Sequence, residues 1–226
     1  MSGIMATLVG GAPCPVEDIH LSLSIAPHLV GVDGGADRIL AAGLIPQRVY
    51  GDLDSLSKEG RQTLHDRLIH VDEQVTTDFD KALRHVGADL AIATGFTGGR
   101  LDHELAVLNA LILRANHPCL LLGEEDVTFL CPPRLALDLP IGTRLSLFPM
   151  RGVEMVSQGL LWPTDGLYFR PDRRVGTSNS VSAPAVRLEP SDAAMLVILP
   201  RVHLREAVAA VHLAPRWPDP EIDIGL

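Results

Sequence analysis

The segment Gly51-Asp52-Leu53-Asp54-Ser55 follows the apolar pair Val49-Tyr50. If Arg48–Gly51 is a strand, both aspartates lie at its carboxyl end, which is where open α/β sheets bind ligands. Residues two apart in an extended segment point to the same side, so the two carboxylates would repel each other. A divalent cation relieves that repulsion, and hard oxygen ligands favour Mg²⁺. The segment therefore predicts an α/β sheet with a metal site at the end of one strand.

A structural interpretation of the two aspartates stays open beside the metal site. Either carboxylate can form an Asx turn or cap a helix. Ser55 is a candidate for that cap, because Lys58-Glu59 resemble the first turn of a helix. The metal site gains support because similar patterns recur at other junctions of the chain.

Asp33 follows a second predicted strand. The apolar run 29–32 is followed by Asp33-Gly34-Gly35, and a helix is expected over 36–42. Two glycines after a strand let the backbone turn sharply and approach a ligand closely. A helix start also offers N–H groups to a phosphate. Asp33 is therefore either a site residue or the cap of a tight strand-to-helix turn.

Asp78 begins a further predicted helix. Thr77 and Asp80 match a capping box, and Phe79 and Leu83 fall on one helical face. An anion is favoured at the first helical position. A structural role is therefore sufficient to explain Asp78 taken alone.

A glycine-rich segment follows the predicted strand 90–93. It contains Gly98-Gly99-Arg100-Leu101-Asp102-His103 and leads into an amphipathic helix pattern over 101–115. Glycine N–H groups and the planar guanidinium of Arg100 are suited to a phosphate. The four junctions together predict a metal and polyphosphate site along one edge of a sheet. The sequence contains neither a P-loop nor a dinucleotide-binding fingerprint.

These motifs, in this order and spacing, resemble those of the thiamine pyrophosphokinase family. The resemblance covers most of residues 5–200 and includes two motifs of the second half. It implies a two-domain homodimer with a thiamine pocket at the subunit interface. It also implies Mg²⁺-dependent transfer of a pyrophosphoryl group from ATP to the hydroxyethyl group of thiamine, with AMP released. The matching segments are Asp33-Gly34-Gly35-Ala36, Gly51-Asp52-Leu53-Asp54-Ser55, Gln74-x-x-Thr77-Asp78, Gly98-Gly99-Arg100-Leu101-Asp102-His103, Gly159-Leu160-Leu161-Trp162-Pro163 and Gly176-Thr177-Ser178-Asn179.

The resemblance implies roles for particular residues. The metal ligands would be Asp33, Asp52, Asp54 and Asp78. The catalytic residues would be Asp52, Asp54, Asp78 and Arg100. Contacts to the nucleotide or its phosphates would come from Gly34, Gly35, Gln74, Thr77, Gly98, Gly99, Arg100 and Asp102. Ser178 and Asn179 would help to hold thiamine. The chain departs from the usual family pattern at Asp37, where Asn is usual, and at Trp162, where Tyr is usual.

The order of the predicted strands and helices along the sequence predicts an α/β fold with two domains. Up to about Gly123, predicted strands alternate with predicted helices, which indicates a three-layer α/β/α domain with a mainly parallel sheet. From about Glu125 the strands are short and separated by Pro and Gly turns, which is typical of a smaller antiparallel β-sandwich or barrel-like domain. We expect an ATP- and Mg²⁺-binding catalytic domain over 1–130 and a thiamine-binding domain over 131–226. The predicted strands are 5–9, 29–32, 48–51, 68–71, 90–93, 119–122, 127–130, 145–148, 153–156, 185–188 and 195–199.

The composition fits a metal-nucleotide enzyme. The chain has 226 residues, is 46% hydrophobic and carries a formal net charge of −9, which argues against a nucleic-acid partner. No apolar stretch reaches the roughly 18 residues that span a bilayer, so no membrane partner is expected. The N-terminus lacks the basic region of a secretory signal. Cys14, Cys119 and Cys131 are odd in number and widely spaced, so we expect no disulfide framework and a cytoplasmic location.

Two other functions stay open at this stage. One is a pyrophosphokinase that acts on another alcohol, such as a hydroxymethyl pterin. The other is a non-catalytic sensor that binds a nucleotide or thiamine diphosphate on the same fold. The motifs at 159–163 and 176–179 favour thiamine over a pterin. The complete set of acids with Arg100 favours an enzyme over a sensor.

Overall fold

The computed structural model describes residues 3–71, 73 and 75–219. By its internal contacts the chain divides into two compact units. One consists of Met1–Ala110 with Leu121–Glu124, and the other of Leu111–Leu120 with Glu125–Leu226. The domain boundary between residues 130 and 131 stays a prediction.

The first unit is built on a parallel sheet. Its strands pair in the order β5-β1-β2-β3-β4, and each of these pairings is parallel. Almost every residue of β1, β2 and β5 is buried, as expected for a parallel sheet that is covered on both faces. The strands are β1 (Met5–Val9), β2 (His28–Val32), β3 (Arg48–Gly51), β4 (Leu68–His70) and β5 (Leu90–Thr94).

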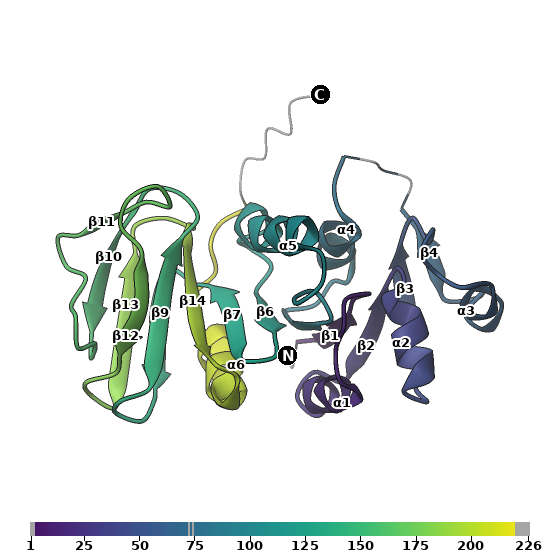
Figure 1. Cartoon of the computed structure of the whole chain (residues 1–226), viewed down its shortest axis with the longest axis horizontal. Coiled ribbons are helices and arrows are strands. Elements are labelled where there is room, and N and C mark those ends of the chain that lie inside the picture. The colour runs from purple at the N-terminus through teal and green to yellow at the C-terminus, as the bar shows by residue number, and fades with distance from the viewer. Residues whose placement is uncertain (1–2, 72, 74, 220–226) are drawn as a thin grey trace. The chain divides into compact units, whose positions relative to one another are not determined.

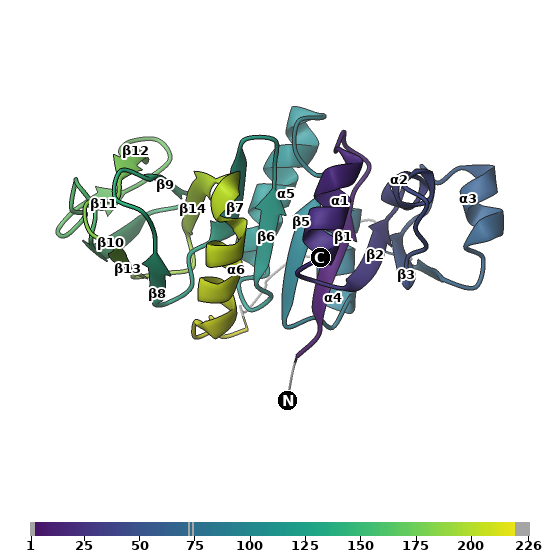
Figure 2. The same cartoon turned by 90° about the horizontal axis from the view of Figure 1, so that it is seen from below.

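Helices cover both faces of this sheet. Figures 1 and 2 show α1 and α2 on one face and α4 and α5 on the other. This arrangement confirms the predicted three-layer α/β/α architecture. The helices are α1 (Val16–Leu23), α2 (Gly35–Ala41), α3 (Lys58–Thr63), α4 (Asp78–His85) and α5 (Leu101–Leu113), and the buried strand β6 (Cys119–Leu122) follows them.

The strand order decides where the loops of the first unit meet. From β1, the chain runs through β2 and β3 to β4 on one side, and then returns to place β5 on the other side of β1. The strands are parallel, so the loops that follow β2 and β3 leave the sheet side by side at its carboxyl edge. The loops after β1 and β5 meet at the point where the strand order reverses, and such points bind ligands in open α/β sheets.

The second unit is antiparallel β structure, as predicted. One group of strands has the order β12-β9-β14-β7, and a separate four-stranded sheet has the order β11-β10-β13-β8. Buried and exposed residues alternate along β8, β10 and β13, so one face of their sheet packs into the core. The elements are β7 (Asp126–Leu130), β8 (Leu135–Asp138), β9 (Arg144–Pro149), β10 (Val153–Gln158), β11 (Tyr168–Phe169), β12 (Gly176–Ser180), β13 (Ala185–Pro190), β14 (Met195–Pro200), η1 (Arg201–His203) and α6 (Leu204–Leu213).

All the strands expected from the sequence are present, with small differences at their ends. The sequence did not indicate α1, α6, β8, β11 or β12. Helix α1 has eight residues and no side-chain cap at its start, so its local signal is weak. Strand β12 consists of Gly, Ser, Thr and Asn residues, which are poor strand formers apart from Thr. Among the residues that the structure describes, no helix has both the length and the apolar character needed to cross a membrane.

Candidate metal and phosphate site

Three of the predicted metal ligands lie together in the first unit. One carboxylate oxygen from each of Asp33, Asp52 and Asp54 lies within 4.8 Å of the other two. Oxygens around one Mg²⁺, each at about 2.1 Å from the ion, lie no more than about 4.2 Å apart, so these three carboxylates are close enough to converge on one ion. The donor set and its spacing therefore fit a hard divalent cation.

The two aspartates of the Asp52-Leu53-Asp54 segment do not come together in the way that we predicted. The strand ends at Gly51, and Leu53 has a φ of 65°, so the segment bends instead of continuing extended. A leucine in the left-handed region costs about 1–2 kcal/mol. The Leu53 side chain is buried against Val49, Leu56 and Leu64, and this packing holds the bend. A hydrophobic anchor, and not strand alternation, therefore sets the geometry of the two carboxylates.

Hydrogen bonds within the loop fix the acids further. The Asp54 N–H donates to Asp52 Oδ1 at 3.1 Å, which is the Asx turn considered above. The Ser55 hydroxyl donates to Asp54 Oδ1 at 3.0 Å. Ser55 does not cap the next helix, because that cap is Ser57, whose Oγ accepts from the Gly60 N–H. The structural and the metal interpretations of these aspartates are thus compatible.

Asp33 occupies a strained and partly buried position beside this loop. Its φ is 46°, its N–H donates to the Tyr50 carbonyl, and its Oδ1 accepts from the Ser55 N–H at 3.3 Å. Burial raises the pKa of Asp33, and the carboxylates of Asp78 and Asp54 act in the same direction, against hydrogen bonds from Ser55 and Gly34. A carboxylate that is poorly compensated in this way gains from a bound cation.

Asp78 approaches the cluster from the start of α4. It is the first residue of that helix, and Thr77 is the N-cap, whose side chain accepts from the Asp80 N–H. Asp78 Oδ1 accepts from the Asp52 N–H at 3.1 Å and from Lys81 Nζ at 3.1 Å. The missing side chain of Gly51 leaves room here, since a Cβ would lie 3.2 Å from Asp33 Cβ and 3.3 Å from Asp78 Cγ. Sequence reasoning missed Lys81, although its position three residues after Asp78 on a helix was a signal.

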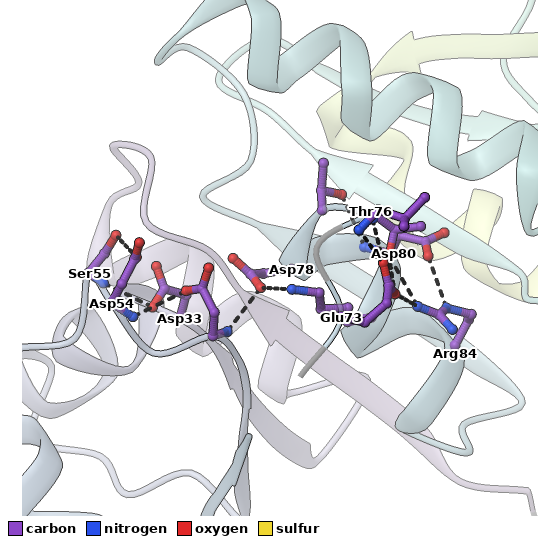
Figure 3. A network of polar contacts seen from close by, with 12 residues as sticks. Asp33, Asp54, Ser55, Glu73, Thr76, Asp78, Asp80 and Arg84 are labelled. Carbon is purple, nitrogen blue, oxygen red and sulfur yellow. Dashed lines mark hydrogen bonds and ion pairs between the residues drawn. The ribbon is translucent and has the colours of Figure 1, made fainter. Parts of the chain in front are cut away.

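A second polar network holds the segment that leads into α4. Arg84 donates to Glu73 Oε2 at 2.7 Å, to Asp80 Oδ2 at 2.9 Å and to Thr76 Oγ1 at 3.1 Å. Figure 3 shows this network beside Asp78. Arg84 thereby connects Glu73 and Thr76, which precede α4, with Asp80 in the first turn of that helix. Gln74, which we predicted to contact the nucleotide, lies outside the described residues.

The pKa of Glu73 reports the strength of this network. Burial alone would raise it, but hydrogen bonds from Thr76, Arg84 and Val75 outweigh that effect and lower the pKa from 4.5 to about 2. Stability gained from a lowered carboxyl pKa is present above the unfolded value and is lost as the pH falls through the folded value. The contribution of Glu73 should therefore be complete above pH 4.5 and disappear as the pH falls toward 2.

Glu73→Gln tests this network. The variant should be less stable than the parent by about 1 kcal/mol at neutral pH, because the charge-assisted hydrogen bonds are lost. The difference should narrow at about pH 3, because the Glu73 carboxyl of the unfolded parent is protonated there while that of the folded parent is still mostly ionised. Urea unfolding of both proteins at the two pH values measures it, with Glu206→Gln on the exposed face of α6 as the control. A difference that does not change with pH would contradict this role.

Gly34 and Gly35 have close backbone neighbours. A Cβ on Gly35 would lie 1.9 Å from the Val9 carbonyl oxygen, and one on Gly34 would lie 3.3 Å from the Ser55 carbonyl oxygen. The close packing of α2 on the end of β1 therefore explains why residue 35 is a glycine. Phosphate contacts by these two glycines stay predictions.

Arg100 and Asp102 form an exposed ion pair at the start of α5. Arg100 donates from Nε to Asp102 Oδ1 at 3.1 Å and from Nη2 to Oδ2 at 2.6 Å. The hydrogen bond from Arg100 lowers the pKa of Asp102. The pair holds the guanidinium in one plane, and its other N–H groups can still reach a phosphate. Gly98 has a φ of 74°, which favours glycine, and its N–H donates to Glu104 Oε2 at 3.1 Å.

Sequence reasoning missed a glycine pair at the switch point of the sheet. Gly10 and Gly11 directly follow β1, and the Gly10 N–H donates to the Thr94 carbonyl at the end of β5. A Cβ on Gly10 would lie 2.4 Å from the Gly95 carbonyl oxygen, so the two loops need glycine to approach each other. The signal was available, because a strand followed by Gly-Gly is the same pattern that singled out Asp33.

Comparison with known proteins points to one family. Residues 19–121 match the family model described as "Thiamin pyrophosphokinase, catalytic domain". This match, together with the relatives described next, supports the thiamine pyrophosphokinase family for this chain. The matched segment contains all four acids and Arg100.

Curated relatives and solved structures extend beyond that segment. Thiamine pyrophosphokinase 2 of Oryza sativa subsp. japonica is 28% identical over 199 residues, which cover 73% of this chain and 74% of the relative. Thiamine pyrophosphokinase of Bacillus subtilis (strain 168) is 32% identical over 113 residues, or 46% of this chain and 53% of the relative. The thiamin pyrophosphokinase structure from Candida albicans has a TM-score of 0.75 at 17% identity and covers 87% of this chain and 88% of its own. The structure from Geobacillus thermodenitrificans has a TM-score of 0.73 at 24% identity and covers 87% and 97%. These structures show that the chain has the fold of the family.

Two departures from the usual family pattern lie in hydrogen-bonded positions. Asp37, where thiamine pyrophosphokinases usually have Asn, accepts from the Ser57 N–H at 2.8 Å and from its hydroxyl at 2.7 Å. A carboxylate offers an acceptor oxygen to each donor, whereas an amide has one oxygen. Trp162 is 58% exposed, and its backbone N–H and carbonyl bond to Asn179 at 3.2 and 2.8 Å.

The predicted thiamine residues lie in β12 of the second unit. Asn179 is buried, and both ends of its amide are used to hold the loop at Trp162. Ser178 has a φ of 60°, and its N–H donates to Ser146 Oγ at 2.9 Å. Asn179 therefore shapes the Gly-Leu-x-aromatic-Pro loop, and its contact with thiamine stays a prediction.

Proposed function

We propose that this chain transfers a pyrophosphoryl group from ATP to the hydroxyethyl group of thiamine. The hydroxyl oxygen of thiamine attacks the β-phosphorus of ATP, and the bond from that phosphorus to the α,β-bridging oxygen breaks. AMP leaves with that oxygen, and the hydroxyl proton is released. The observation that carries the proposal is the cluster of Asp33, Asp52 and Asp54 at the edge of the parallel sheet in a chain that matches the catalytic-domain model of this family.

The acids account for the cation that the reaction needs. Asp33, Asp52, Asp54 and Asp78 would hold Mg²⁺, which when bound would neutralise phosphate charge and orient the reacting groups. Asp52, Asp54 and Asp78 are fixed by hydrogen bonds to backbone N–H or side-chain donors, so their carboxylates are preorganised. Preorganised charge is the main source of rate enhancement in phosphoryl transfer.

Arg100 would contact the phosphates outside the acid cluster. Its guanidinium is exposed and is oriented by Asp102. A planar cation that binds two phosphate oxygens would stabilise the charge that develops as AMP leaves. The reaction needs no covalent enzyme intermediate, and a base is required only if the alcohol loses its proton early.

Product analysis tests the proposed reaction directly. The protein is incubated with ATP, Mg²⁺ and thiamine, and AMP, ADP and thiamine diphosphate are quantified. Equal amounts of AMP and thiamine diphosphate would support the proposal. ADP in place of AMP would mean transfer of a single phosphoryl group and would overturn it. Turnover with a hydroxymethyl pterin alone, or nucleotide binding without AMP, would favour one of the two other functions. The family match does not favour either of them.

A homodimer is part of the proposal, with the loop at Leu161 and Trp162 in its interface. These adjacent apolar side chains are 54% and 58% exposed, and Asn179 fixes the backbone that carries Trp162. Large exposed apolar side chains on a rigid loop are typical of interaction surfaces.

Trp162→Glu should weaken the dimer. A charge in an apolar interface is unfavourable, so the dissociation constant should rise by about 100-fold or more. Light scattering across a range of protein concentrations measures the change. Leu213→Glu, at an 83% exposed position at the end of α6, is the matched control. A parent protein that is monomeric at micromolar concentration would contradict the proposed dimer.

A cytoplasmic location also stays a prediction. It is supported by the three cysteines, which are all free in the structure. Cys119 and Cys131 are buried, and burial raises the pKa of both thiols. Such thiols are unreactive, which fits structural roles in the core.

A further inference from the structure

Lys81 is a buried lysine at the edge of the acid cluster. Its side chain is 2% exposed, and its Nζ lies 3.1 Å from Asp78 Oδ1. Burying an ammonium group is unfavourable unless it is paired. Lys58 and Lys81 are the chain's two lysines among 19 basic residues, and Lys58 is exposed on α3.

Packing alone does not explain a lysine at this position. Residues 79–83 of α4 are all buried, so an apolar residue at position 81 would bury the same stem without a charge. The charged end must therefore be useful, and it donates a hydrogen bond to Asp78, a carboxylate of the proposed site. A helix pair with this spacing is worth little on a surface, but these groups are largely removed from water.

The contact also determines which oxygen of Asp78 is available. Oδ1 accepts from both Lys81 Nζ and the Asp52 N–H, each at 3.1 Å. Figure 3 shows these two contacts on one oxygen of Asp78, while the other oxygen points toward Asp33 and carries no dashed line. Asp78 Oδ1 is thus engaged in hydrogen bonds within the protein, and the other oxygen of Asp78 faces the acid cluster.

We infer that Lys81 is a positioning residue that offsets part of the negative charge of the acid cluster and so sets its affinity for a divalent cation. The inference rests on the proposed cation site at Asp33, Asp52 and Asp54. The ammonium balances Asp78 in the free protein and keeps the cluster folded before a cation binds. It also prevents the site from holding a cation so tightly that the metal–nucleotide complex cannot exchange.

Lys81→Met should therefore bind a divalent cation more tightly than the parent. A unit charge about one side chain away from a divalent ion changes the affinity by about tenfold even at a water-like dielectric constant. The probe is Mn²⁺ alone, titrated into the nucleotide-free protein and followed by the electron paramagnetic resonance of free Mn²⁺. The concentration of Mg²⁺ that gives half-maximal turnover should fall in parallel. Thermal unfolding should show a larger gain in Tm from Mg²⁺ in the variant than in the parent.

Three further variants make the experiment decisive. Lys81→Gln removes the charge but keeps a donor for Asp78, and it replaces Lys81→Met if that variant does not fold. Lys81→Arg keeps the charge and should restore the parent affinity for Mn²⁺. Lys58→Gln removes the exposed lysine and should leave the affinity within about twofold, because exposed charges are screened.

The outcomes separate this inference from the proposed function. Tighter Mn²⁺ binding in each neutral variant that folds, with the parent affinity restored in Lys81→Arg, would support it whether or not thiamine is the substrate. Unchanged or weaker Mn²⁺ binding in the neutral variants, with a loss of Tm that Mg²⁺ does not restore, would overturn it and leave Lys81 a purely structural residue. If Mn²⁺ does not bind to the parent protein, the cation site itself is wrong, and the inference falls with it.

Discussion

Asp54→Asn should lower kcat by about 100-fold or more, the usual effect of removing one preorganised charge that acts in the transition state. Asp54 is at the centre of the proposed site, since its carboxylate oxygen lies within 4.8 Å of those of Asp33 and Asp52. The amide that replaces it keeps one acceptor for the Ser55 hydroxyl, so the loop should keep its shape. The fold should therefore survive, and the loss should appear in turnover and in the requirement for Mg²⁺.

Steady-state kinetics at several Mg²⁺ concentrations measure this effect. Asp192→Asn is a control with the same change of charge, at an exposed aspartate that pairs with Arg151 in the second unit. It should leave kcat within about twofold, because surface ion pairs contribute little. Ser55→Ala removes the hydroxyl that bonds to Asp54 and should have a smaller effect than Asp54→Asn. Near-normal turnover in Asp54→Asn would contradict the assignment of Asp54 as a metal ligand.

Gly35→Ala should destabilise the protein by about 3 kcal/mol, although alanine is the better helix former by about 1 kcal/mol. The new Cβ would lie 1.9 Å from the Val9 carbonyl oxygen and 2.6 Å from its carbon, both of which are backbone atoms. Backbone atoms of a central strand cannot move aside as a flexible side chain can. Helix α2 must therefore shift away from β1, and Asp33, which precedes the helix, must move with it.

Urea unfolding and kcat should both report the shift caused by Gly35→Ala. Gly11→Ala is the matched control, because the nearest atom to its Cβ would be 3.9 Å away, at the Gly35 nitrogen. That variant should change stability by no more than about 0.5 kcal/mol. Equal stability of the two variants would show that the approach of α2 to β1 is not required.

The sequence predicted the strands and the meeting of the acids. The run Arg48–Gly51 was recognised as a strand and is β3, because a short apolar run bounded by Gly and Asp has few other solutions. Asp33 and the Asp52-Leu53-Asp54 segment follow adjacent parallel strands, so their proximity follows from the topology. The strands follow from the hydrophobic pattern, and the meeting of the acids follows from a parallel sheet, in which the carboxyl ends of the strands share one edge.

The local geometry of the site could not be predicted in this way. The left-handed bend at Leu53 exists because a buried apolar cluster holds it, and that cluster joins Val49 of β3, Ala36 of α2 and Leu64, which follows α3. The N-cap of α3 is Ser57 and not the predicted Ser55. Asp37, in a different helix, accepts a hydrogen bond from the Ser57 N–H and so fixes this residue at the start of α3. The meeting of Gly10 with Gly95 depends on the reversal of strand order at β1.

The sequence by itself determined that this chain is an α/β protein with acids at the strand ends and an antiparallel β half. Periodicity and glycine positions determine these features, because each residue's preference for strand, helix or turn depends on its near neighbours. Only the tertiary structure decided that Lys81 is buried, that Asn179 holds the Trp162 loop, and that Leu53 bends the acidic segment. In each case the fold supplies the surroundings of the side chain. Burial stabilises the apolar Leu53, whereas the polar groups of Lys81 and Asn179 need their hydrogen-bond partners to offset the cost of leaving water.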